Sequence, residues 1–341
     1  MEALTRLSGL RDRDAMDRSL VEALGQLLAA SRVAVHRVVG DSGDEHWLTG
    51  ACLLAGLHTQ PMDPSWMDMR ELPLLASQPD WARCARQAVE LVLPSGKATQ
   101  QGLVVLFPLG SDTGTVGVVE VCTDTSPSEE LLAMANGVLS VFRNINSLLD
   151  YSESDTLTGL LNRKSFDETF YKASALPLSQ LHADTERRQP GPLRYWLGVI
   201  DIDHFKLVND HHGHLIGDEV LLLLARVMRQ SFRFLDKLYR FGGEEFVVLM
   251  RCQGEDDAQH ALERLRQNVA NHVFPRVEHV TVSVGYTDVR IGDTPPSAVE
   301  RADLAVYYAK RHGRNQVRSH AALVREGELA DIAQTSDIEF F

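Results

Sequence analysis

A glycine pair followed by two acidic residues stands out as a candidate for chemistry, within the segment from Tyr239 to Phe246. Gly242 and Gly243 allow a tight reversal because glycine adopts positive φ angles at little cost. Glu244 and the next glutamate follow, and apolar residues on both sides predict a buried hairpin. Carboxylates on a rigid turn suit a divalent cation and the phosphates that it carries. For this segment alone, an exposed acidic turn without such a role is the alternative.

A second pair of carboxylates ends an apolar run that begins at Trp196. Strand alternation puts Asp201 and Asp203 on one face, with Ile200 and Ile202 on the other. If this strand pairs with the hairpin, Asp201 and Glu244 approach each other closely. Two carboxylates at short distance repel, and a divalent cation is the usual compensation. A lone acidic residue at a strand end is otherwise a cap or turn residue.

These segments resemble the GGDEF domain of the diguanylate cyclase family, in its Gly-Gly-Glu-Glu-Phe form. The resemblance covers residues 155–317, about half of the chain. Its matching pieces, in order, are residues 155–163, 201–218, the glycine turn, 282–285 and 310–315. The resemblance implies an α+β fold with a five-stranded antiparallel sheet core wrapped by helices, like the palm of nucleotide polymerases and the nucleotidyl cyclases.

The resemblance also implies an activity, the condensation of two GTP molecules into cyclic di-GMP with release of two pyrophosphates. Each domain would bind one GTP, so a homodimer is part of the implied mechanism. By matched position, Asp201, Glu244 and the backbone carbonyl of Ile202 would hold Mg²⁺ or Mn²⁺. Glu244 is also the family's proposed general base. The alternative is a catalytically silent receptor for cyclic di-GMP or GTP, although silent relatives usually lose the signature residues that this chain keeps.

Further matched positions imply substrate contacts. An Asp carboxylate accepts hydrogen bonds from the N1–H and amino group of guanine, a donor pair that adenine lacks. The implied guanine contacts are Asn209 and Asp218, with His214 at a further pocket position. The implied triphosphate contacts are Lys206, Lys310 and Arg314, with Arg240 as an additional cation and Gly242 and Gly243 at the turn. Without the resemblance, His214 is a structural histidine in a glycine turn and Asp218 a helix N-cap.

An arginine and an aspartate three residues apart precede the glycine turn, Arg233 and Asp236. Such a pair is usually an ordinary surface pair. Here its offset resembles the family's inhibitory site for cyclic di-GMP, and arginine suits stacking on guanine and bidentate contacts. Arg264 matches a third arginine of that site, with Arg266 as the alternative. The resemblance therefore implies feedback inhibition by the product.

The N-terminal part predicts a helix over residues 14–31 and strands at 33–39, 103–109 and 116–121. This order suggests an antiparallel sheet flanked by helices and resembles a GAF domain, with PAS as the competing interpretation. Either an unknown small ligand or a purely dimerising role fits. Haem bound through a histidine is conceivable, although structural histidines are commoner. The histidines in question are His36, His46 and His58.

A long helix is predicted from residue 128 to 155, where it would join the two domains. Its apolar residues follow a heptad spacing, which suits either packing on its own domain or pairing with a twin helix in a homodimer. The residues of this seam are Leu131, Ala135, Val138, Phe142, Ile145 and Leu149.

Length and composition set the remaining limits. The 341 residues predict two domains, at 1–150 and 155–320, with a peripheral tail at 321–341 and a surface loop at 178–194. A net charge of −13 argues against broad binding to nucleic acid or anionic membrane. Four scattered cysteines suggest free thiols in a reducing cytoplasm. Neither a signal peptide nor an apolar membrane span is expected.

Overall fold

The computed structural model describes residues 13–40, 43, 45–59, 72–94, 102–110, 116–174, 194–233, 235–277 and 279–330. It divides into two compact units, residues 1–152 and 153–341, which we call unit 1 and unit 2. The predicted surface loop lies outside the described residues except for Arg194, which begins a strand. Across the described ranges, every helix is too short or too polar to cross a membrane.

Unit 1 is built on an antiparallel sheet with the strand order β3-β2-β1-β6-β5-β4. The apolar, valine-rich runs that predicted strands form three of them, so the three predicted strands are confirmed as β1, β5 and β6. The strands are β1 (Arg32–Val39), β2 (His46–Leu54), β3 (Leu57–Thr59), β4 (Leu91–Pro94), β5 (Leu103–Gly110) and β6 (Val116–Thr123).

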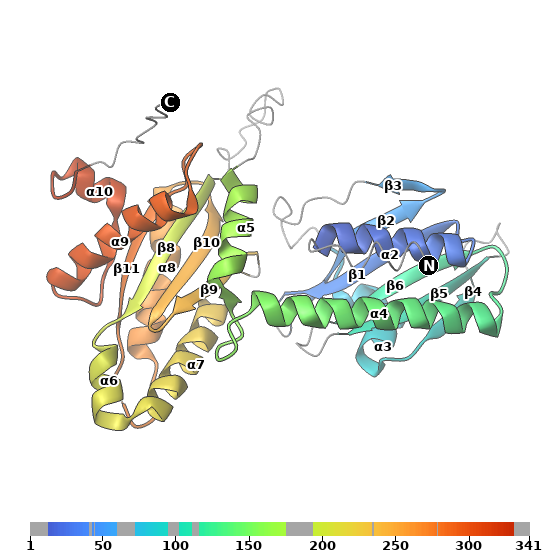
Figure 1. The fold of residues 1–341 in the computed structure, drawn as a ribbon, viewed down its shortest axis with the longest axis horizontal. Coiled ribbons are helices and arrows are strands. Elements are labelled where there is room, and N and C mark those ends of the chain that lie inside the picture. The colour runs from blue at the N-terminus through green and yellow to red at the C-terminus, as the bar shows by residue number, and fades with distance from the viewer. Residues whose placement is uncertain are drawn as a thin grey trace, which may run out of the picture. The chain divides into compact units, whose positions relative to one another are not determined.

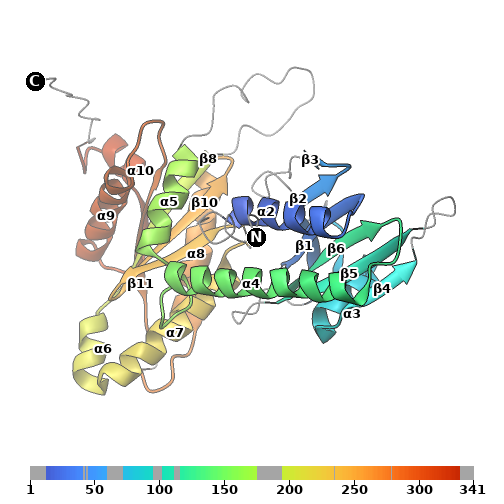
Figure 2. The same cartoon turned by 45° about the vertical axis from the view of Figure 1, so that its right-hand side comes forward.

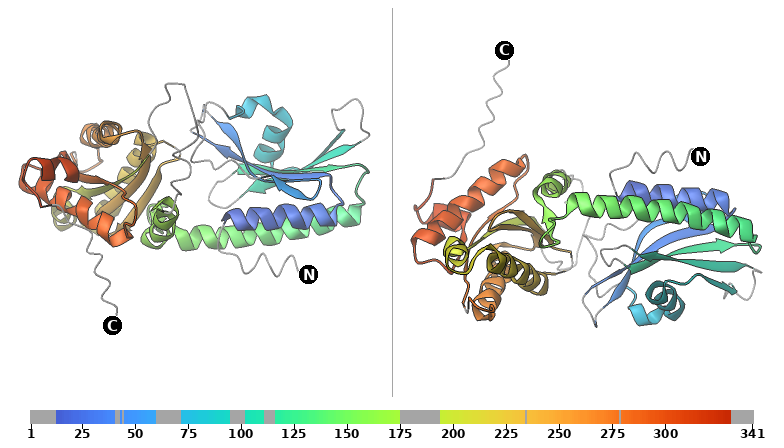
Figure 3. Two further views of the ribbon diagram at one scale, coloured as in Figure 1. Left: turned by 90° about the horizontal axis from the view of Figure 1, so that it is seen from above. Right: turned by 60° about the horizontal axis from the view of Figure 1, so that its bottom comes forward.

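Helices cover both faces of this sheet (Figures 1 and 3). α2 (Arg13–Leu27) and α4 (Glu129–Glu153) pack on one face, and α3 (Pro79–Gln87) packs on the other beside a short 3₁₀ turn. α2 ends before the predicted residue 31, because Ala29 takes a left-handed conformation and Ala30 N–H closes on the carbonyl of Gly25. The predicted sheet flanked by helices is therefore present in unit 1.

The heptad seam of α4 faces the core of its own unit. Ala135 and Phe142 are fully buried there, and the four other seam residues pack against the same apolar cluster. Packing within the domain is thus the correct one of the two alternatives. The seam residues are not available for pairing with a twin helix.

Unit 2 contains a second sheet with the order β12-β11-β8-β10-β9-β7. The four central strands are antiparallel, and the two edge strands run parallel to their neighbours. The sheet has six strands where the resemblance implied a five-stranded antiparallel core, because two short parallel strands of two and three residues extend its edges. The strands are β7 (Leu161–Asn162), β8 (Arg194–Ile202), β9 (Lys237–Gly242), β10 (Glu245–Cys252), β11 (Val282–Asp288) and β12 (Val317–Ser319).

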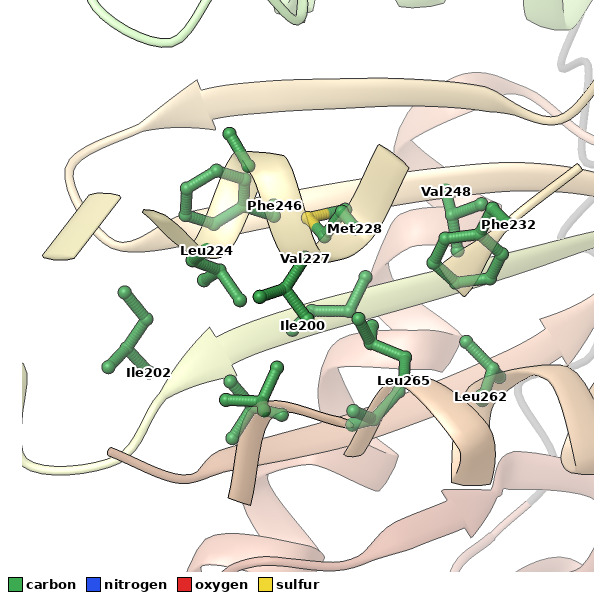
Figure 4. Close-up of a cluster of buried hydrophobic side chains, with 14 of the residues drawn as sticks. Ile200, Ile202, Leu224, Val227, Met228, Phe232, Phe246, Val248, Leu262 and Leu265 are labelled. Carbon is green, nitrogen blue, oxygen red and sulfur yellow. The ribbon is translucent and has the colours of Figure 1, made fainter. Parts of the chain in front are cut away.

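Two apolar layers hold the helices of unit 2 to the sheet. On one face Ile200 and Phe246 meet α7 and α8, as the side chains in Figure 4 show. On the other face the core joins α5 and α9 to the sheet. α6 and α7 form a bent pair that follows the end of β8 (Figure 2). The helices are α5 (Arg163–Ser174), α6 (Phe205–His212), α7 (His214–Ser231), α8 (Glu255–Asn271) and α9 (Pro295–Arg311).

The beginning of the predicted peripheral tail is part of the packed domain. α10 (His320–Arg325) follows β12 directly, and His320 and Leu323 are buried. Arg325 also pairs with Glu255 of α8 at 3.1 Å. The prediction of a peripheral tail from residue 321 is therefore wrong for the helical residues 321–325, since so short a helix carries too few apolar residues to show a repeat.

Candidate active site

The glycine turn between β9 and β10 and the acidic C-terminal end of β8 lie at the same end of the strands in the unit 2 sheet. In the antiparallel register Glu245 faces Asp201 on one side and Gly242 on the other. Gly242 and Gly243 have φ angles of 136° and 54°, so both use the conformational freedom that glycine provides. Glu244 directly precedes the residue that pairs with Asp201. The sequence-predicted approach of Asp201 and Glu244 is therefore present.

The electrostatics of these two carboxylates reflect their proximity. Burial raises the pKa of Glu244 above its ordinary value, and the charge of Asp201 raises it further. Burial likewise raises the pKa of Asp201, while the ammonium of Lys310 acts in the opposite direction. Lys310 Nζ lies 2.7 Å from Asp201 Oδ1. Ionisation of the pair is thus costly unless a cation is near, and Lys310 supplies one such charge.

Oxygen ligands of this kind suit a hard divalent cation. The predicted metal set has two carboxylates and one backbone carbonyl, that of Ile202. Consistent with so small a set, no group of three or more acidic, histidine or cysteine side chains in the described ranges is arranged to hold a metal. The mutual repulsion of Asp201 and Glu244 is the feature that fits a bound cation.

Asp203 has a different surrounding from Asp201. Its carboxylate accepts hydrogen bonds from the hydroxyls of Thr281 and Ser283, each at 2.7 Å, and from the backbone N–H of Asn315 at 3.0 Å. Only 6% of its surface is exposed. Asp203 therefore ties the end of β8 to β11 and to the segment that follows α9, close to Lys310 and Arg314 in the chain.

The residues predicted to contact guanine lie on α6 and α7. Asn209 packs over Gly217, where a Cβ added to the glycine would lie 2.0 Å from Asn209 Oδ1, so a larger residue would displace the Asn209 side chain. His214 and Asp218 are exposed on the first turns of α7. The alternative role of Asp218 as an N-cap is wrong, because Gly213 occupies that position and the helix begins at His214.

The predicted phosphate-binding cations differ in their surroundings. Lys206 on α6 and Arg314 after α9 are exposed. Lys310, on the last turn of α9, is the one that reaches Asp201. Arg240 donates to the carbonyl of Gly243 at 2.9 Å and pairs with Asp155 at 3.0 Å. Its guanidinium thus holds the glycine turn in place.

The residues of the predicted inhibitory site gather beyond the end of α7. Arg233 N–H donates to the carboxylate of Asp236 at 2.9 Å, and burial raises the pKa of Asp236. Arg264 donates to the carbonyl of Ser231 at 2.7 Å and acts electrostatically on Asp236. Arg266 instead pairs with Glu263 and donates to Asn315. The geometry therefore brings Arg264, rather than Arg266, to this pair.

Asp303 of α9 belongs to the acidic cluster, although the sequence motifs did not predict it. Burial together with the charges of Glu245 and Asp201 raises the pKa of Asp303 to about 6. Its spacing places Asp303 on the same face of α9 as Lys310, but only the packing of α9 on the sheet brings it to Asp201 and Glu245. Asp155 is a second residue of the site that was not predicted as such. It begins a segment that matches the family and pairs with Arg240.

The histidines considered as haem ligands in unit 1 have structural partners. His36 is buried, contacts Thr49 at 2.9 Å and Glu120 at 3.2 Å, and stacks on Trp81. His46 is buried against the carbonyl of Leu72, and His58 contacts Glu22. Both ring nitrogens of His36 are thus occupied, which favours the structural interpretation.

Comparison with known proteins is informative for unit 2. Residues 152–316 match the family model described as "Diguanylate cyclase, GGDEF domain". The chain is 37% identical over 168 residues to diguanylate cyclase DgcZ of Escherichia coli, which covers 48% of this chain and 52% of that protein. It is also 37% identical over 185 residues to response regulator PleD of Caulobacter vibrioides, covering 52% of this chain and 38% of the relative. The matched segment thus spans about half or less of these relatives.

Among solved structures, the chain is similar to the GGDEF domain of DgcB from Caulobacter crescentus in complex with c-di-GMP. That match has 32% identity and a TM-score of 0.44, and covers 50% of this chain and 96% of that one. It is also similar to the active GGEEF domain of a diguanylate cyclase from Vibrio cholerae, with 34% identity and a TM-score of 0.41. That match covers 47% of this chain and 97% of the other.

Proposed function

Because residues 152–316 are a GGDEF domain of the diguanylate cyclase family, we propose that this protein condenses two GTP molecules into cyclic di-GMP and two pyrophosphates. The observation that carries the proposal is that the carboxylates of Asp201 and Glu244 lie together at one end of the central strands, with Lys310 beside them. Phosphoryl transfer depends on positioning and charge stabilisation more than on covalent catalysis. The carboxylates and the lysine at this site would supply both.

Asp201, Glu244 and the carbonyl of Ile202 would hold Mg²⁺ or Mn²⁺. Such an ion would neutralise charge on the triphosphate as a Lewis acid. The fit is supported by the raised pKa values of both carboxylates, because a nearby cation would lower them and favour the ionised forms.

The remaining residues of the chain would bind and orient GTP. Asn209 and Asp218 would recognise guanine, with His214 beside them at the start of α7. Lys206, Lys310 and Arg314 would contact the phosphates. Arg240 would act through the turn rather than on the substrate, because Asp155 and the carbonyl of Gly243 engage it. Glu244 would take the proton of the attacking 3′-hydroxyl.

A direct test incubates the full chain with GTP and Mg²⁺ and separates the nucleotides by chromatography. Glu244→Gln should abolish cyclic di-GMP, because the amide can neither share a cation's charge nor accept the proton. The matched control is Glu326→Gln, the same change at an exposed residue after α10. Wild-type protein that binds GTP yet yields no product would instead favour the silent receptor.

A homodimer would bring two GTP-loaded domains together. The buried heptad seam of α4 cannot serve, but α4 carries a second, exposed apolar stripe, which we call the outer stripe. Its members are spaced by seven, seven and three residues, as in a two-stranded coiled coil. They are Met134 (58% exposed), Val141 (38%), Leu148 (69%) and Tyr151 (74%). Pairing through the outer stripe would remove these side chains from water.

Product inhibition would use Arg233, Asp236 and Arg264, which lie together beyond the end of α7. Guanidinium groups there suit stacking on guanine and contacts with phosphate. Arg233→Ala should leave the initial rate intact and relieve inhibition by added cyclic di-GMP. Inhibition that persists unchanged in this variant would refute the assignment.

Unit 1 would regulate the cyclase as a GAF-like sensor, joined to unit 2 through the long helix α4. The proposal is supported by its antiparallel sheet between helices. Its ligand would be a small molecule, and mass spectrometry of molecules retained by the purified full chain is the test. Protein that never carries a retained molecule would favour a dimerising role.

A further inference from the structure

A cavity of about 520 Å³ lies in unit 2 between α5 and α9, beside the strand that leads into the glycine turn. Helix residues form two of its walls, and Phe241 of β9, next to Gly242, forms part of a third. A cavity of this size accommodates a small organic molecule. Its described lining includes none of the residues proposed above for GTP, metal or cyclic di-GMP.

The walls of this cavity are rich in aromatic surface. Of the lining rings, Phe166 is buried, whereas Tyr171 and Tyr307 are 54% and 60% exposed. Two tyrosines this exposed at one opening leave ring faces that a flat ligand can cover. The aromatic surface therefore favours a planar, largely apolar body.

The charge of the lining is predominantly negative. It contains the carboxylates of Asp167, Glu300 and Asp303 against the single guanidinium of Arg163. Within the described chain, no hydrogen bond or ion pair engages any of these three carboxylates. Asp303 also lies in the field of Asp201 and Glu245, which the charges of Arg163 and Lys310 oppose in part. A cation gains from this potential, and an anion is repelled by it.

Two of the aromatic rings that line the cavity already contact arginine side chains of the chain itself. The guanidinium carbon of Arg163 lies 5.3 Å from the ring centre of Phe241, and that of Arg311 lies 5.7 Å from Tyr307. Both distances are typical of cation–π contacts. The aromatic walls thus have the geometry that binds planar cations.

We propose that this cavity is a binding site for a small organic cation with a flat apolar body, such as an aryl amidine. The ring would lie against Tyr171 and Tyr307, and the charged group would pair with Asp303 and Glu300. The test of this proposal is independent of the cyclase activity, because it measures binding alone and uses none of the residues proposed to contact GTP, metal or cyclic di-GMP.

Benzamidine is a suitable probe, and benzamide is its neutral isostere. Calorimetric titration of the full chain should give a benzamidine Kd of about millimolar, as expected for so small a ligand. Benzamide should bind roughly tenfold more weakly, because it lacks the charge that the carboxylates and rings attract. Equal binding of the two compounds, or no benzamidine binding, would overturn the proposal.

Substitutions locate the site. Asp303→Asn and Tyr307→Ala should each weaken benzamidine binding by about fivefold or more, since each removes one proposed contact. The matched control is Glu326→Gln, at an exposed residue outside the cavity. Thermal unfolding verifies that each variant is folded. A Kd that Tyr307→Ala leaves unchanged would place the cation elsewhere and refute the assignment.

Discussion

Asp203 offers the sharpest test of how the site is held together. Its buried carboxylate accepts two hydroxyl hydrogen bonds at 2.7 Å and the N–H of Asn315 at 3.0 Å. Hydrogen bonds to a charged group contribute roughly 1 kcal/mol more than neutral ones. In Asp203→Asn one oxygen can still accept from Thr281 and Asn315, but the amide NH2 cannot accept from Ser283. An amide costs less to bury than a carboxylate, so we expect a net loss of about 2 kcal/mol. Asp203→Ala leaves all three donors unpaired and should cost about 4 kcal/mol.

Hydrogen exchange of the full chain, read by mass spectrometry, measures this loss by segment. A loss of about 2 kcal/mol should accelerate the slowest amides of β8 and β11 about 30-fold, while amides of β1 and β6 in unit 1 serve as an internal control. Asp210→Asn, at an exposed residue of α6, is the matched variant. Acceleration below about threefold in Asp203→Asn, or equal acceleration in unit 1, would refute the reasoning.

Three further outcomes are expected. Asp303 has a folded-state pKa of about 6, above its ordinary value, so its ionisation costs stability as pH rises from about 4 to 6. Asp303→Asn should therefore stabilise the metal-free protein by about 1 kcal/mol near pH 8, after discounting for solvent screening, and by nothing near pH 3, as urea unfolding would show. Leu148→Glu on the outer stripe should convert dimer to monomer in sedimentation, and persistent dimer would exclude that stripe. Arg264→Ala should weaken cyclic di-GMP binding by about tenfold in calorimetry, whereas Arg266→Ala should leave it intact, and the reverse order would reassign the arginine.

Much of this architecture could be predicted from the sequence because its signals are local. Continuous apolar runs in β8 and β10 and two adjacent glycines predict a hairpin and a partner strand. The approach of Asp201 and Glu244 followed from that pairing. No periodic pattern marks β7 or β12 in the sequence, because these edge strands are only two and three residues long.

Other features depend on tertiary contacts that spacing does not encode. α4 has two apolar stripes, and only the folded unit shows that the one containing Phe142 is buried while the one containing Leu148 is exposed. Asp203 looked equivalent to Asp201, yet its partners come from residues about 80 and 112 positions away. Likewise, Asp303 joins the acidic cluster only because α9 packs against the sheet.

The central claim is that Asp201 and Glu244 share one divalent cation at a guanine nucleotide's phosphates. Titration of Mn²⁺ with a non-hydrolysable GTP analogue, followed by electron paramagnetic resonance of free Mn²⁺, measures this directly. Asp201→Asn and Glu244→Gln should each weaken Mn²⁺ binding by about tenfold or more, and the double variant should be little weaker than either, because both remove the same ion. Wild-type affinity in either single variant, or losses that simply add, would contradict the claim.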